Sequence, residues 1–212
     1  MNGSSRGLRT FRAVVEYDGT QFAGFQRQAR ARTVQQTLET ALAAVVGVPV
    51  RVTGAGRTDT GVHASGQVVS FRADTRLDDA TLQRATNARL PADLVMRDLA
   101  TAPAGFSARR DAVTRTYEYR VSERAVRPTL DRGRVWHVGR VLDVPAMRVA
   151  AAAFVGMHDF TAFCVGRPPS TVRQIEAVTI WREGDMVLIR IAGNAFLQRM
   201  VRRMVGALVR VG

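Results

Sequence analysis

The segment Thr33–Phe71 reads TVQQTLETALAAVVGVPVRVTGAGRTDTGVHASGQVVSF, and its pattern decides the fold. Apolar residues recur at helical spacing between Thr33 and Gly47, at Val34, Leu38, Leu42 and Val45. Because threonine caps helix N-termini and glycine commonly ends helices, this pattern predicts one helix between those two residues. The β-prone runs at 50–53 and 67–71 predict two strands that are joined by a glycine-rich loop.

The flanking sequence completes one α/β unit around this segment. Strands are expected over 11–17 and 94–100, and a helix over about 78–90 with Leu82 and Ala85 facing inward. The resulting order is β-α-β-β-α-β, which is typical of a ferredoxin-like unit.

The second half of the chain repeats this order. The expected elements are a strand over 114–121, a short strand near Trp136, a helix from Val144 to about Gly156 capped by Asp143, a hairpin around 183–185, and a final helix over 195–211. This gives β-α-β-β-α, without a last strand. We therefore predict an α/β (α+β) protein with two ferredoxin-like (RRM-like) halves, 1–103 and 104–212. The halves are expected to join into one mixed, mainly antiparallel sheet, with helices on one face and a cleft between them.

The charge of the chain indicates a polyanionic partner. Its 212 residues carry 31 basic side chains, all of them arginine, against 18 acidic ones, and the net charge is +13. Arginine forks suit phosphate oxygens, so nucleic acid is the first candidate and a membrane surface a weaker one. A lone cysteine, Cys164, excludes an internal disulfide framework. The opening residues MNGSSRGLR lack the apolar region of a secretory signal and are expected to be a disordered lead-in, so we expect a cytoplasmic protein.

The glycine-rich loop, TGAGRTDTGVHAS at 53–65, has several readings. Asp59 stands where a dinucleotide fingerprint needs its third glycine, and a phosphate-binding Walker loop needs a lysine that the chain lacks. Two readings remain. The loop could be a plain hairpin, because turns favour glycine and aspartate, or it could be a catalytic loop. The length of the loop favours catalysis, and Arg57 could keep the Asp59 carboxylate ionised.

Two further elements carry candidate residues. In the final helix, one face is apolar and is expected to be core, at Leu197, Met200, Val201, Met204, Val205 and Leu208. Arg199, Arg203 and Arg210 lie opposite as a solvated stripe, whereas Arg202 falls on the flank, where it could pair with a carboxylate. In the strand over 114–121, the side chains Arg115, Tyr117 and Tyr119 share one face and could form a platform on which a base stacks; Phe22 and Phe25 are weaker candidates. Three scattered histidines support no zinc site.

These motifs resemble those of the tRNA pseudouridine synthase A family over almost the whole chain. GRTDTGVHA at 56–64 is similar to its signature GRTDAGVHA, and YDGTQFAGFQRQ at 17–28 to its opening motif. The spacing of aromatic and basic residues over 106–119, and the blocks GMHDFTAFC and GNAFLQRMVRRMVGALVRVG, also resemble the family in the same order.

The resemblance implies specific roles for residues of this chain. Asp59 would be the catalytic nucleophile, Arg202 would pair with it, and Tyr117 would contact the target base and assist proton transfer. The substrate-binding residues would be Tyr117, Arg57, Arg109, Arg115 and Gln26. The implied activity is isomerisation of uridine to pseudouridine at positions 38–40 in the anticodon stem-loop of tRNA. A homodimer, a positively charged cleft, no metal and no cofactor are implied as well.

The chain departs from the family pattern at two places. Thr60 stands where the family has alanine, and the sequence stops at Gly212 where the family continues into a strand with a PA-x-GL-x-L motif. This strand is the one missing from the second half, and we expect its absence to leave a sheet edge open.

The residues leave the chemical route open. The Asp59 carboxylate could attack C1′ of the ribose, attack C6 of the base, or remove the 2′ proton. The charge and the tyrosines alone would also suit an RNA-binding protein without activity, and an aspartate beside an arginine would suit a nucleoside hydrolase.

Overall fold

The chain forms two compact units, Met1–Ala112 and Val113–Gly212. The computed structural model describes residues 7–212, so most of the expected N-terminal lead-in lies outside the described residues. The predicted boundary, between residues 103 and 104, falls nine residues before the one that separates these units. The two units are described separately below.

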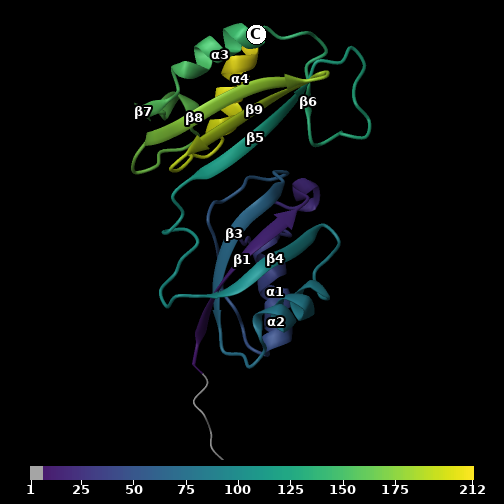
Figure 1. Ribbon diagram of the computed structural model, residues 1–212, viewed down its shortest axis with the longest axis vertical. Helices are drawn as coiled ribbons and strands as arrows, with labels where there is room; N and C mark the ends of the chain where they lie inside the picture. The colour runs from purple at the N-terminus through teal and green to yellow at the C-terminus, as the bar shows by residue number, and fades with distance from the viewer. Residues whose placement is uncertain (1–6) are drawn as a thin grey trace, which may run out of the picture. The chain divides into compact units, whose positions relative to one another are not determined.

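The first unit is a four-stranded antiparallel sheet with two helices. Its elements are β1 (Arg9–Tyr17), α1 (Val34–Val46), β2 (Val52–Gly54), β3 (Ala64–Ala73), α2 (Asp79–Asn87) and β4 (Leu94–Ala102), with a short 3₁₀ turn at Gly19–Gln21. The strand order is β2-β3-β1-β4, and Figure 1 shows β1 between β3 and β4. The elements follow the predicted order, and the central strand β1 pairs with both β3 and β4.

The first helix begins and ends where the sequence predicts. The Thr33 side chain accepts a hydrogen bond from the Gln36 N–H, and Gly47 ends the helix in the left-handed region at φ 82°. Val34, Leu38 and Leu42 are buried against the inward face of the sheet. Leu82 of α2 joins this core as expected, but Thr86 is buried in place of Ala85.

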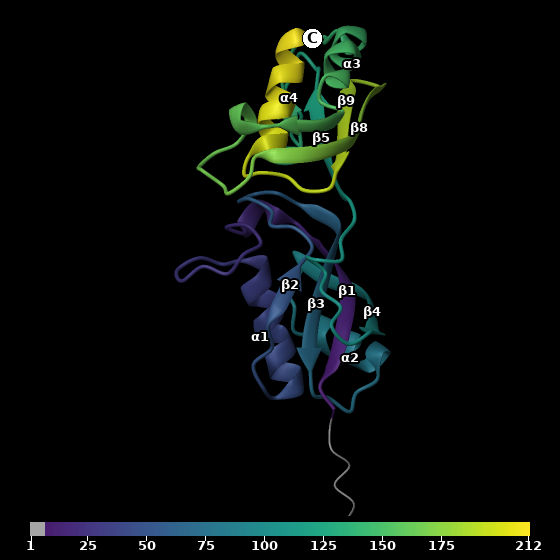
Figure 2. The ribbon, with the colours of Figure 1, turned by 90° about the vertical axis from the view of Figure 1, so that its left-hand side faces the viewer.

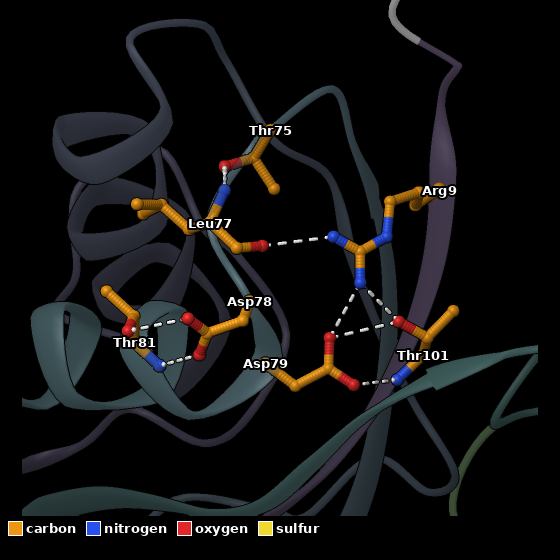
Figure 3. A network of polar contacts seen from close by, with 7 residues as sticks. All are labelled: Arg9, Thr75, Leu77, Asp78, Asp79, Thr81 and Thr101. Atoms are coloured by element: carbon orange, nitrogen blue, oxygen red, sulfur yellow. Dashed lines mark hydrogen bonds and ion pairs between the residues drawn. The ribbon is translucent and has the colours of Figure 1, made fainter.

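A polar network fixes the start of α2 to the ends of β1 and β4 (Figure 3). The Asp79 carboxylate lies 2.7 Å from Nη2 of Arg9 and also accepts the Thr101 N–H at 2.7 Å. Arg9 Nη1 donates to the Leu77 carbonyl, while Asp78 caps α2 by accepting the Thr81 N–H. The network therefore closes the end of the unit at which β1 begins.

The second unit is a five-stranded sheet with two helices on one face (Figure 2). Its elements are β5 (Arg115–Ser122), β6 (Trp136–His137), α3 (Val144–Ala152), β7 (Gly156–Asp159), β8 (Val172–Glu183), β9 (Met186–Gly193) and α4 (Met200–Val211), with a 3₁₀ turn at Thr161–Phe163. The strand order is β6-β5-β9-β8-β7. Asp143 caps α3 as predicted. The short strand β7 was not predicted.

The expectation of one joined sheet is wrong for the described strands. They form two sheets, one in each unit. In the second sheet β5 is an interior strand, because β9 pairs with its whole length and β6 pairs with Val121 and Ser122.

The final helix starts five residues later than predicted. Arg199 adopts φ 60°, a left-handed conformation, so the helix begins only at Met200. The predicted apolar face is nevertheless correct: Met200, Met204, Val205 and Leu208 are buried in the core of this unit, and Leu197 packs there from the preceding loop.

Glu123 anchors the end of β5 and makes stability depend on pH. Its side chain is 6 % exposed and accepts two hydrogen bonds from Arg182, at 2.8 and 2.9 Å, and one from the Leu142 N–H. The Arg182 hydrogen bonds hold the Glu123 pKa below its ordinary value, against the opposing effect of burial. The ionised form is therefore favoured by folding, and its contribution is present above the unfolded pKa of about 4.3 and is lost as pH falls through the lower folded value.

We expect Glu123→Gln to lower the melting temperature of the second unit by about 4–8 °C at pH 7, which corresponds to loss of one charged hydrogen-bonded contact. The difference from wild type should shrink as pH falls from about 4 through the lower pKa of folded Glu123, because below that pKa both proteins carry a neutral side chain. Calorimetry from pH 3 to pH 8 measures this. A difference that stays constant over the whole range would contradict the assignment.

Candidate active site

The loop between β2 and β3 presents Asp59 at one end of the first unit. Asp59 is half-buried, and its carbonyl accepts the Val62 N–H at 3.2 Å, which closes a turn. Gly61 in this turn has φ 79°, a conformation that side-chain-bearing residues rarely adopt. Within the described part of its own unit, the Asp59 carboxylate has no hydrogen bond or ion pair. It is therefore available to a substrate.

The main chain of the loop after β1 holds Asp59 on both sides. The Phe25 N–H donates to the Thr58 carbonyl at 3.0 Å, and the Gly61 N–H donates to the Phe22 carbonyl at 3.3 Å. These two bonds bracket Asp59 in the sequence. The YDG-type opening motif and the Asp59 loop thus form one structure, although about 35 residues separate them in the chain.

Gly24 shows how closely the two loops approach each other. It has φ 92°, and a Cβ atom placed on it would lie 2.7 Å from the Thr58 carbonyl oxygen and 3.3 Å from the Asp59 carbonyl carbon. Any side chain at this position would displace the backbone that carries Asp59. A glycine here is therefore required both by its conformation and by space.

The proposed stacking role of Phe22 and Phe25 is wrong. Both rings are buried, with 1 % and 3 % exposure, and belong to the core of the first unit. The guanidinium of Arg32 covers the Phe22 ring at 4.1 Å from its centroid, which leaves no open face there for a base. Their aromatic side chains anchor the loop whose main chain holds Asp59.

A chain of hydrogen bonds reaches the Asp59 loop from β1 and β3. The Gly56 N–H donates to Oε1 of Gln67 at 3.1 Å, Nε2 of Gln67 donates to Oη of Tyr17 at 3.2 Å, and this oxygen lies 2.8 Å from Oγ1 of Thr58. Neither Tyr17 nor Gln67 was predicted to take part in the candidate site. A usable signal was present, since Tyr17 continues the inward alternation of β1 while carrying a hydroxyl that needs a partner.

His63 fixes the far end of the loop. Its Nδ1 accepts the Gly19 N–H at 3.1 Å and lies 3.1 Å from Oδ1 of Asp18. The imidazole therefore joins the loop to the turn that follows β1.

The other candidates in the first unit are surface residues. Arg57, Gln26 and Arg109 are exposed. Among the described residues of this unit no ion pair joins Arg57 to Asp59, so the structure gives no support to the idea that Arg57 keeps this carboxylate ionised. Their exposure does suit contacts with a large substrate.

In the second unit, Arg115, Tyr117 and Tyr119 share one face of β5 as predicted, and all three are half-buried. It is the face that the helices cover, and Tyr119 packs against the core. The Tyr117 ring meets Phe196 edge to face, with centroids 5.1 Å apart, and Arg115 donates to the Asn194 carbonyl. Of the two tyrosines, Tyr117 therefore lies beside the loop that leads into α4.

The arginines of α4 differ from the prediction. Arg202 is exposed, not drawn inward, and has no hydrogen bond or ion pair within the described part of its own unit. Arg203, assigned to a solvated stripe, donates to the carbonyls of Ala162 and Cys164, because the turn at 161–163 packs against α4. Arg202 thus remains able to pair with an acidic group.

Two features are absent from the part of the chain that the structure describes. In residues 7–212 no group of three or more histidine, cysteine or acidic side chains could hold a metal ion. None of the helices described is long and apolar enough to cross a membrane.

The Asp59 carboxylate has no partner in the described part of its own unit, and the chain carries a net charge of +13; both features suit an enzyme that acts on nucleic acid. Comparison with known proteins defines it further: the family model for tRNA pseudouridine synthase matches residues 13–109 and 150–212. The chain belongs to this family.

Relatives support the same assignment. The chain is 45 % identical over 201 residues to a tRNA pseudouridine synthase A from Halalkalibacterium halodurans, covering 93 % of this chain and 76 % of the relative. It is also 45 % identical over 205 residues to one from Methylobacterium nodulans, covering 95 % and 81 %. The protein is thus an isomerase that forms pseudouridine in tRNA.

Proposed function

We propose that the enzyme isomerises uridine at positions 38–40 in the anticodon stem-loop of tRNA, with Asp59 as the catalytic nucleophile. The observation that carries the assignment is the Asp59 carboxylate: its backbone is held by Phe22 and Phe25, and it has no partner in the described part of its own unit. A fixed carboxylate without an internal partner is free to react with a bound nucleoside.

We assign the remaining roles as follows. Arg202 pairs with the Asp59 carboxylate in the working enzyme and keeps it ionised. Tyr117 stacks on the extruded uracil and assists proton transfer at C5. Arg57, Arg109, Arg115 and Gln26 bind the RNA together with Tyr117. Support comes from the exposure of Arg202, Arg57, Arg109 and Gln26 and from the half-buried position of Tyr117.

The reaction conserves every atom of the nucleoside. The N1–C1′ bond breaks, the uracil turns, C5 bonds to C1′, and the C5 proton is lost while N1 gains one. No oxidant, reductant or second substrate is consumed, so a carboxylate and a proton-transferring group suffice. Because the target base lies in or beside a stem, it must leave its stack, at a cost of about a few kcal/mol that stacking and phosphate contacts offset.

We also propose the larger assembly. Each unit is a ferredoxin-like half, the halves border a basic cleft, and the enzyme works as a homodimer in the cytoplasm without a cofactor. The strand order β2-β3-β1-β4 with helices after β1 and β3 supports this for the first half. The net charge of +13 supports a basic RNA-binding surface.

Mapping of pseudouridine by carbodiimide treatment and primer extension tests the proposal. We expect new stops at uridines 38–40 of an unmodified tRNA and none in a matched transcript that carries cytidine at these positions. Tyr117→Ala and Arg202→Ala should each reduce the stops. Stops confined to another region would overturn the anticodon assignment. RNA binding without stops would indicate a binding protein, and released uracil a hydrolase.

A further inference from the structure

We propose that the hydrogen-bond chain Gln67–Tyr17–Thr58 is a positioning device for Asp59. The inference rests on the proposed role of Asp59 and adds residues that do not touch the substrate. Tyr17 and Gln67 lie on the paired strands β1 and β3, whereas Thr58 precedes Asp59 in the loop. The hydrogen-bond chain therefore connects two paired strands of the sheet to the residue next to Asp59.

The direction of the bonds follows from their donors. The Gly56 N–H can only donate, so the Gln67 atom facing it is the carbonyl oxygen Oε1. The amide nitrogen of Gln67 must then face Tyr17, whose oxygen accepts at 3.2 Å. In our proposal the Tyr17 hydroxyl donates a hydrogen bond to Oγ1 of Thr58, 2.8 Å away.

The chain fixes Thr58 from a second side. Its carbonyl already accepts the Phe25 N–H, and its side chain is held by Tyr17. Together the two contacts define the plane of the peptide that joins Thr58 to Asp59, and hence the direction in which the carboxylate leaves the backbone. Tyr17 is 3 % exposed, so water does not compete for this contact.

Such a device is needed because the loop is rich in glycine. Gly54, Gly56 and Gly61 give its backbone a freedom that would scatter the carboxylate over many positions. A misplacement of about 1 Å in a reacting group can cost on the order of 100-fold in rate. We therefore expect the chain to act on the chemical step and to leave RNA binding unchanged.

The test compares Tyr17→Phe, Thr58→Val, Thr58→Ser and the double variant Tyr17→Phe/Thr58→Val. Single-turnover pseudouridine formation, tRNA Kd and Tm are measured for each. Both single variants should lose about 10- to 100-fold in rate, with Kd within about twofold of wild type. Thr58→Ser keeps the hydroxyl and should recover most of the rate lost by Thr58→Val. The double variant should be no slower than the worse single variant, because both break the same chain.

Thr86→Val is the matched control. Thr86 is also a buried threonine of the first unit, and it donates to the Leu82 carbonyl at 2.8 Å within α2. Its loss should lower Tm and leave the rate unchanged, which separates positioning from stability.

Other outcomes would overturn the proposal. These are a wild-type rate for Tyr17→Phe, multiplicative losses in the double variant, or a rate loss that follows Tm in all variants including Thr86→Val. Asp59→Asn, assayed in parallel, tells the two hypotheses apart. Inactivity of Asp59→Asn beside full activity of Tyr17→Phe rejects only the positioning chain, whereas an active Asp59→Asn rejects the proposed function itself.

Discussion

Asp59→Asn is expected to reduce pseudouridine formation by at least about 1,000-fold, because an amide can act neither as a nucleophile nor as a base. The substitution keeps the shape of the side chain. The bonds to Phe22 and Phe25 involve only main-chain atoms, so the loop should keep its conformation. We therefore expect tRNA binding to be retained while single-turnover product formation is lost.

Asp74→Asn provides the control for charge. Asp74 belongs to the same unit, is half-buried like Asp59, and has no hydrogen bond or ion pair among the described residues of that unit. Both variants raise the net charge by one, so an electrostatic effect on RNA affinity would appear in both. Activity of Asp59→Asn within about tenfold of the Asp74→Asn value would contradict a nucleophilic role.

Glu39→Ala is expected to destabilise the first unit by about 3 kcal/mol, since it leaves the buried Val52 N–H without a partner and removes the hydrogen bonds from Gln35 and Arg27. Glu39 lies in α1 and is 4 % exposed. Its carboxylate accepts the Val52 N–H at 3.1 Å, Nε2 of Gln35 at 3.0 Å and Nη1 of Arg27 at 2.9 Å. It thereby ties α1 to β2, the strand that leads into the Asp59 loop.

Urea unfolding and amide hydrogen exchange measure this effect. Exchange should accelerate in α1 and β2 and stay unchanged in the second unit. Glu16→Ala is the control, because its side chain is 52 % exposed and lies 3.6 Å from Arg97 on the surface, where an ion pair contributes little. Equal losses of unfolding free energy for the two variants would show that the contacts of Glu39 contribute no more to stability than an exposed ion pair does.

Local chemistry explains how far the fold could be predicted. Thr33 and Gly47 act on neighbouring backbone groups, so both ends of α1 followed from the sequence. The start of α4 did not, because the apolar spacing runs on to Leu197, which reaches the core from a loop, and Arg199 takes a left-handed conformation without being glycine. Side-chain periodicity reports which residues are buried, and it does not by itself report where the helical backbone begins.

The candidate site, too, was predictable only in part. Asp59 could be found from its glycine-rich loop and its resemblance to a known motif. The sequence indicated that the buried Tyr17 hydroxyl needs a partner, but the partners could not be predicted, because the contacts join residues 41 and 50 positions apart and depend on how β1 and β3 pair. Phe22 was misassigned for the converse reason: a polar stretch of sequence suggested exposure, whereas folding buries its ring under Arg32.

The close approach of Gly24 to the Thr58 carbonyl has a consequence for loop exchange between relatives. With no space between the two backbones, neither segment can be lengthened or redirected alone. A chimera that receives a foreign 56–64 segment should need the matching 19–27 segment from the same donor. The two stretches should therefore behave as one transferable module, although α1 and β2 separate them in the chain.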